Sequence, residues 1–336
     1  MKGKTTGASP GAVGLVPAER LQLPSGVDSN SPAHWSGEEL VVFTSHPEFG
    51  APMRLSGTDV SHLNRAEPVR FDHDINGYRW IEATWQDEHS GRLYAWYHNE
   101  PKGVCAGTHS PASVGELTAP RIGAAVSEDD GRTWLDFGLI MEGAADQIDC
   151  QARNGFFAGG HGDFCIVATP DFVYVLFGNY GGRVEEQGVA IARMAWSDRN
   201  DPAGKVWKWH GDRWESPGIG GLVTPIFPAM TAWQSEDCDA FWGPSVHWNT
   251  EINQYVMLLN RASGTGWVQE GIYVSFSREV EDPKSWSAPQ QVFAGGSWYP
   301  QVIGTGPKDS DKRAGAGARV FIKGVSDHQL SFVDQH

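Results

Sequence analysis

The chain has 336 residues, with 41 glycines, 20 prolines and 15 tryptophans, and its formal net charge at pH 7 is −15. This composition favours many short strands joined by tight turns over helices. The acidic balance argues against nucleic acid and anionic membrane surfaces as partners, and no apolar run approaches the roughly 20 residues that span a bilayer.

Residues 1–24 are rich in Gly and Pro and begin with basic residues, but they contain no continuous hydrophobic core of a secretion signal. The protein is therefore either cytoplasmic, or secreted or periplasmic after removal of a leader. For the fold, this segment predicts a flexible tail, or alternatively a strand that closes the structure against the last repeat. Residues 25–336 are expected to form a single domain.

A two-strand pattern recurs five times along that domain at intervals of roughly 55 to 80 residues. The first strands of the pairs are predicted at residues 28–35, 78–85, 162–169, 242–248 and 298–304. The second strands are predicted at residues 38–45, 91–100, 171–180, 253–262 and 318–327. The similar segments DSNSPAHW (28–35) and WGPSVHW (242–248) occupy the same place in two repeats.

The three middle repeats add further strands. Third strands are predicted at residues 121–129, 187–196 and 270–279, and fourth strands at residues 131–138, 205–211 and 285–292. Five four-stranded antiparallel units, each too small to bury its own faces, predict an all-β, five-bladed β-propeller.

The segment SEDDGRTW (127–134) resembles the Asp-box pattern of sialidases and other propellers. We expect a hairpin brace in which Ser and Asp side chains bond the turn and Trp134 packs inward. The four cysteines have no C-x-x-C spacing and predict no structural zinc site. Either two disulfides or buried free thiols fit the sequence.

In a propeller the innermost strands line a central funnel, so their first residues and the ends of the second strands meet at one face. The first residues bring three acids together, Asp28, Glu82 and Asp163, which we predict to be catalytic. The residues predicted to contact substrate are Trp80, His98, Glu100, Asn179, Glu186, Trp242, His247, Arg261, Glu270 and Trp298. Carboxylates, histidines and tryptophans in one funnel indicate a carbohydrate site.

These residues resemble those of the five-bladed β-propeller glycoside hydrolases, the superfamily of arabinanases, arabinofuranosidases and invertases. The resemblance implies one acid on each of the first three inner strands: a base or nucleophile, a carboxylate that tunes pKa and orients, and a general acid. Glu82 in WIEATW matches the second, and Asp163 in GHGDFC lies near the third. In blade one, Asp28 is displaced from the proline and Asn30 lies nearer the family's position.

The resemblance also allows a cation such as Ca²⁺ in the central channel, although no EF-hand loop or His-x-x-x-His pair forms a dedicated metal site. His34 and His247 occupy matching places. Each is a metal ligand, a hydrogen-bonded filler or, by resemblance to the anhydrogalactosidase branch of this superfamily, the catalytic acid. Two other functions are open. One is a sialidase-like hydrolase, which requires six blades, and the other is a carbohydrate-binding propeller without catalysis.

Overall fold

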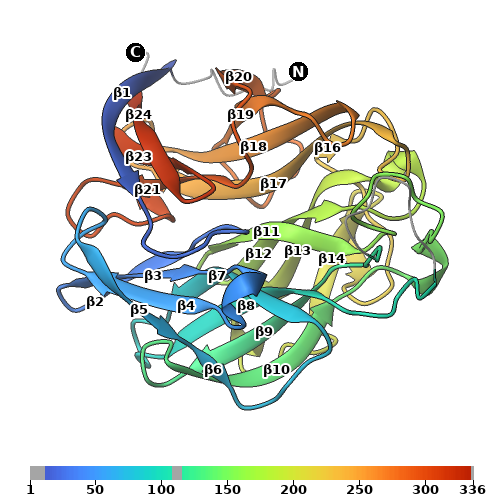
Figure 1. Ribbon diagram of the computed structural model, residues 1–336, viewed down its shortest axis with the longest axis horizontal. Helices are drawn as coiled ribbons and strands as arrows, with labels where there is room; N and C mark the ends of the chain where they lie inside the picture. The colour runs from blue at the N-terminus through green and yellow to red at the C-terminus, as the bar shows by residue number, and fades with distance from the viewer. Residues whose placement is uncertain (1–11, 108–115, 334–336) are drawn as a thin grey trace, which may run out of the picture.

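The computed structural model describes residues 12–107 and 116–333, and strand pairing sorts them into five sheets, each built on four antiparallel strands (Figure 1). The innermost strands are β2 (Ala33–Ser36), β7 (Tyr78–Gln86), β11 (His161–Ala168), β17 (Asp237–Asn249) and β21 (Pro300–Gly304). The second strands are β3 (Glu39–Thr44), β8 (Leu93–Glu100), β12 (Phe172–Asn179), β18 (Gln254–Thr265) and β23 (Gly317–Ile322). This confirms the predicted five-bladed β-propeller.

The outer strands complete the blades. The third strands are β4 (Met53–Gly57), β9 (Arg121–Ser127), β13 (Gly188–Ala195), β19 (Gln269–Ser277) and β24 (Val325–Val333). The fourth strands are β5 (Leu63–Pro68), β10 (Thr133–Met141), β14 (Val206–His210), β20 (Gln290–Ala294) and β1 (Ala12–Gln22). Short additions are β6 (Arg70–Phe71), β15 (Arg213–Pro217), β16 (Phe227–Pro228), β22 (Arg313–Ala314) and the 3-10 turns η1 (Pro47–Phe49), η2 (Ala145–Gln147), η3 (Val184–Glu186) and η4 (Trp196–Asp198).

The ring is closed by the two ends of the chain. Strand β1, blue in Figure 1, lies antiparallel along the red β24 as the outermost strand of the last blade. Residues 12–22 therefore follow the alternative expectation of a closing strand and are not a flexible tail, while residues 1–11 lie outside the described part. The physical reason is that β24 would otherwise present an unpaired edge.

One predicted strand is corrected. The sequence pattern placed a single strand over residues 318–327, but a tight turn at Lys323 and Gly324 divides it into β23 and β24. Both turn residues have positive φ, 48° and 76°, as a two-residue hairpin requires. This turn carries Lys323 to the functional face, as described below.

The core consists of apolar layers between neighbouring blades. Five clusters of buried side chains each join two adjacent blades around the ring. Because both faces of a blade are covered, its second strand is apolar at nearly every position, as in Val173 to Phe177, instead of alternating. No helix among the described residues is long and apolar enough to cross a bilayer.

The inner strands of blades two to four each contain a β-bulge, with one more residue than the paired second strand has over the same stretch. The register shifts fall between Ile81 and Ala83, between Gly162 and Cys165, and between Trp242 and Ser245. Such bulges free backbone groups and redirect side chains. The Asn30 side-chain amide satisfies two freed carbonyls, donating to Phe164 O at 2.9 Å and to Pro244 O at 3.0 Å.

The SEDDGRTW segment forms the β9–β10 turn with the predicted contacts. Ser127 Oγ accepts the Gly131 N–H at 2.8 Å, and Asp129 accepts the N–H of Thr133 at 2.8 Å. Gly131 has a φ of 82°, and Trp134 is buried between blades one and two. These contacts are structural and lie away from the axial cavity described next.

The cysteines divide between the two expectations. Cys105 and Cys150 form a disulfide that ties two loops together across a sequence separation of 45 residues. Cys165 and Cys238 are buried free thiols. The sequence could not decide between these states because neither partner has a diagnostic spacing.

Candidate active site

A cavity of about 670 Å³ opens at the face where the inner strands begin. Each blade contributes a lining residue from its inner strand or from the segment just before it, in order Asp28, Trp80, Asp163, Trp242 and Tyr299. The predicted funnel residues Glu100 and Trp298 line it as well. Convergence of five strand ends therefore gathers residues that lie far apart in the sequence.

Asp163 is the most perturbed acid of this cavity. It sits in the β11 bulge with a φ of 44°, a conformation that non-glycine residues rarely adopt, and it is only 4% exposed. Burial raises the pKa of Asp163 to about 7, with His98 opposing the rise and Glu82 adding to it. The Tyr180 hydroxyl donates a hydrogen bond to Asp163 Oδ2. A carboxyl of this pKa can hold a proton near neutral pH and release it.

Glu82 lies behind the cavity wall. Its Oε2 accepts the backbone N–H of Phe164 at 2.7 Å, and its Oε1 lies 3.4 Å from His98 Nδ1. The Glu82 carboxylate thus braces the bulge that carries Asp163. This position fits an orienting carboxylate better than one that touches substrate.

Asp28 belongs to blade one, where it precedes β2, and its side chain is 28% exposed. Lys323 Nζ lies 3.6 Å from Asp28 Oδ1. Partial burial raises the pKa of Asp28, and the charge of Lys323 opposes that rise. Asn30, which lies nearer the family's expected position, points instead into the axis, where it bonds backbone carbonyls.

Aromatic side chains form much of the wall. Trp242 packs edge-on against Trp298 and Tyr299, with ring centroids 5.5 Å and 5.8 Å away. Phe156 and Trp267 continue this surface, with centroids 4.9 Å apart. Flat apolar rings beside carboxylates suit the C–H faces and hydroxyls of sugars.

The residues of this site that were not predicted from the sequence include Tyr180, Tyr299 and Lys323. Tyr299 immediately precedes Pro300 at the start of the fifth inner strand, so the rule that found Asp28 would also have found it. Tyr180 directly follows β12, one residue after the predicted Asn179. Lys323 was hidden inside the strand that the turn divides.

Six residues predicted to contact substrate do not line the cavity: His98, which is buried, and Asn179, Glu186, His247, Arg261 and Glu270. Asn179 bonds the carbonyls of Gly181 and Glu186, and Glu186 itself pairs with Arg183 beside another surface hollow. His247 is 1% exposed between blades four and five, and neither ring nitrogen has a hydrogen-bond partner among the described residues. Arg261 pairs with Asp239 and with Glu270 on blade four. Only side chains that point toward the axis can line the cavity, whereas these side chains contact neighbouring strands or turns.

The matching histidines are therefore fillers in both repeats. His34 Nε2 contacts Asp130 Oδ1 at 2.8 Å, which links blade one to the β9–β10 turn. His247 packs its ring against Phe332. Neither is placed to hold an axial cation.

One cluster in the described part of the chain has the composition of a metal site. Glu82, His98 and Asp163 offer ligand atoms that all lie within 4.8 Å of one another. Each group already has a protein partner, however, in Phe164 N, Glu100 and Tyr180. Ca²⁺ takes six to eight oxygen ligands, so two carboxylates and an imidazole are a poor fit, and the cluster is better described as a hydrogen-bonded network.

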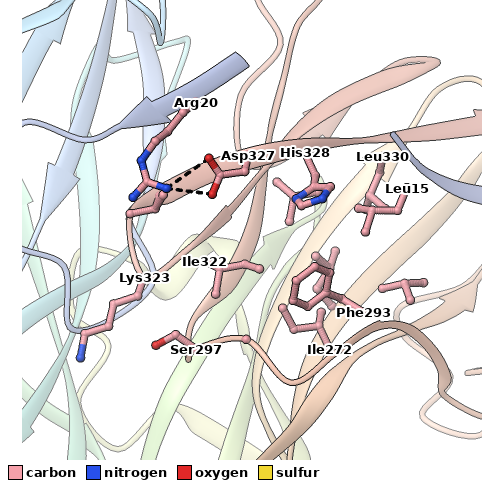
Figure 2. Close-up of a pocket in the computed structure, with 15 residues that line it drawn as sticks. Leu15, Arg20, Ile272, Phe293, Ser297, Ile322, Lys323, Asp327, His328 and Leu330 are labelled. Atoms are coloured by element: carbon pink, nitrogen blue, oxygen red, sulfur yellow. Dashed lines mark hydrogen bonds and ion pairs between the residues drawn. The ribbon is translucent and has the colours of Figure 1, made fainter. Parts of the chain in front are cut away.

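A second cavity, of about 420 Å³, lies between blades four and five (Figure 2). Its lining is mainly apolar, with Ile272, Phe293 and Leu330 at its wall, and its one carboxylate, Asp327, is paired with Arg20 at 3.1 Å. Lys323 contributes its stem here while its ammonium faces Asp28. This cavity lacks the paired acids of the axial one.

The sequence matches no family model and no curated protein. The fold is similar to that of an endo-arabinase from Bacteroides thetaiotaomicron, with a TM-score of 0.54 and 9% identity over 93% of this chain and 96% of that one. It is also similar to the native arabinanase of Bacillus subtilis, with a TM-score of 0.50 and 10% identity over 93% of this chain and 95% of that one. These similarities establish the shared propeller fold, and they leave the sialidase-like alternative without its six blades.

Proposed function

We propose that the protein is a glycoside hydrolase that cleaves a polysaccharide or its oligosaccharides in the axial cavity. The observation that carries this proposal is the Asp163 carboxyl, which is buried at the end of an aromatic-lined cavity with a pKa raised to about 7. A general acid for glycoside cleavage must hold a proton near neutral pH, and burial among apolar groups and carboxylates is how proteins achieve this.

The roles follow from the positions of the acids. Asp163 donates its proton to the glycosidic oxygen as the C–O bond breaks. The Asp28 carboxylate either takes a proton from an attacking water or attacks the anomeric carbon itself. A separation of about 5 to 5.5 Å serves the second route and roughly 6.5 to 9.5 Å the first, so the product anomer distinguishes them. Glu82 orients the acid through Phe164 N–H.

Carbohydrate is the partner that the wall suits, because Trp242, Trp298 and Tyr299 present flat rings beside hydrogen-bonding carboxylates. The two similar structures described above are arabinanases, which makes arabinan the first substrate to test. The Cys105–Cys150 disulfide supports an oxidising compartment, where such bonds persist.

The test is release of reducing sugar from a panel of arabinan, galactan, xylan and fructan by wild type, Asp163→Asn and Asp74→Asn. Asp74 is an exposed acid that does not line the cavity, and it serves as the matched control. We expect Asp163→Asn alone to lose activity by about 10² to 10⁴-fold. Calorimetric binding of a glycan without any turnover would instead indicate the non-catalytic carbohydrate-binding propeller.

A further inference from the structure

His98, from β8, occupies the centre of the acid cluster. Its Nε2 lies 3.2 Å from Glu100 Oε1, and its Nδ1 lies 3.4 Å from Glu82 Oε1 and 3.2 Å from the backbone nitrogen of Asp163. The side chain is only 3% exposed. One buried ring therefore touches all three acidic residues that surround the bulge.

The bulge depends on the pair that His98 forms with Glu82. The Phe164 N–H in the bulge donates to Glu82 Oε2 at 2.7 Å, and the backbone nitrogen of Asp163 lies 3.2 Å from His98 Nδ1. A buried N–H without its acceptor is costly, so the Glu82 carboxylate, which His98 holds in place, fixes the backbone that aims the Asp163 carboxyl. Removal of the ring leaves the Glu82 carboxylate without the imidazole that orients it.

The chain also makes room for this ring. A Cβ built at Gly162 would lie 2.5 Å from His98 Cε1, so any larger residue would displace the imidazole. The ring of Trp80 covers another side, with centroids 5.2 Å apart. The backbone at Gly162 and the ring of Trp80 therefore hold the His98 imidazole in place from two sides.

The charge of His98 follows from its neighbours. Burial lowers the pKa of His98, but the hydrogen bonds to Glu100 and Glu82 outweigh this effect and raise it well above its ordinary value. The imidazolium then donates to both carboxylates. Its positive charge opposes the effect of burial, Glu82 and Glu100 on Asp163, as the Tyr180 hydrogen bond also does.

We infer that His98 is a positioning residue for Asp163: it holds the Glu82 carboxylate that braces the bulged backbone, and it supplies the positive charge between the surrounding carboxylates. This inference rests on the proposed function for its catalytic meaning. Its structural content, a charged ring that sets the protonation of a neighbouring carboxyl, stands apart from any turnover. Asp163 transfers the proton, while His98 orients the Asp163 carboxyl and shifts its protonation equilibrium.

The experiment compares wild type with His98→Gln and uses His247→Gln as the matched control, because His247 is also buried but lies on blade four and has no hydrogen-bond partner among the described residues. Carbon-13 NMR of labelled aspartate gives the pKa of the Asp163 carboxyl without substrate. The dependence of kcat/KM on pH is then measured on the glycan that wild type cleaves.

We expect His98→Gln to raise the pKa of Asp163 by at least about one unit, a tenfold change in its protonation equilibrium. The alkaline limb of the kcat/KM profile should move upward with it, and activity at pH 6 should fall at least about tenfold because the carboxyl is misplaced. His247→Gln should change neither the titration nor the profile. Gly162→Ala, which keeps the imidazole but displaces it, should shift the Asp163 titration as well.

An unchanged Asp163 titration in His98→Gln, or an equal shift in His247→Gln, overturns the inference. If His98→Gln fails to fold, nitrogen-15 NMR of wild type decides the matter, since a neutral His98 ring at pH 7 contradicts the proposed charge. Absence of turnover on every glycan would reject the proposed function while leaving these titrations interpretable.

Discussion

The substitution Asp163→Asn should make the protein more stable at alkaline pH while it removes activity. The folded environment raises the pKa of Asp163 from 3.8 to about 7. At 1.36 kcal/mol per unit, the ionised carboxylate costs on the order of 4 kcal/mol in the folded state above pH 7. Asn is neutral at every pH and can still accept the Tyr180 hydroxyl hydrogen bond.

The pH window follows from the sign of this shift. Because the folded pKa exceeds the unfolded one, the folded state binds more protons between about pH 4 and 7, and wild-type stability falls as pH rises through that range. The advantage of Asp163→Asn should therefore be small near pH 4, grow toward pH 7 and then stay constant. Its upper bound is about 4 kcal/mol, because relaxation and water entry reduce the cost in the wild type.

The assay is urea unfolding of both proteins at pH 4.5 and pH 8.5, with hydrolysis measured in parallel. Asp74→Asn, an exposed substitution, should show no pH-dependent difference from wild type. Equal stability differences at the two pH values, or a variant that is less stable than wild type at pH 8.5, would refute the reasoning about burial. Full retention of activity would separately refute the assignment of Asp163 as the acid.

Three further outcomes test other parts of the molecule. Burial lowers the pKa of Lys208 to about 7, and its side-chain nitrogen lies 3.0 Å from His161 Nε2. Because the unfolded state binds the extra proton, the stability of the wild type should rise with pH between 7 and 10.5. The variant Lys208→Met should therefore be more stable than wild type by roughly 2 to 4 kcal/mol in urea unfolding at pH 6, with little difference near pH 10. Replacing both disulfide cysteines with Ser should lower the unfolding free energy by about 4 kcal/mol and remove the sensitivity of unfolding to reductant, whereas a reductant-sensitive double variant would contradict the pairing. Trp298→Ala should raise KM about tenfold with kcat little changed, because a stacking surface binds ground and transition states alike, and Trp207→Ala, on an exposed site of β14, should leave KM unchanged.

The sequence alone determined the architecture, because local sequence patterns specify the strands and turns of each blade. Apolar second strands such as residues 171–180 and turn-rich hairpins repeat at intervals that only a ring of similar blades explains. The same logic placed the acids at strand starts, and Asp28 and Asp163 do line one cavity with Trp80, Trp242 and Trp298. Strand direction and side-chain period are local properties, so they can be read without the fold.

Tertiary structure decided which side chains face the axis and what surrounds them. Bulges at Glu82 and Asp163 depend on long-range contacts, among them Asn30 to Phe164 and His98 to Asp163, that no local pattern encodes. The same holds for the turn that delivers Lys323 to Asp28 and for the burial that raises the pKa of Asp163. Protonation and orientation arise from neighbours brought together by ring closure, and those neighbours are separated by tens to hundreds of residues in the chain.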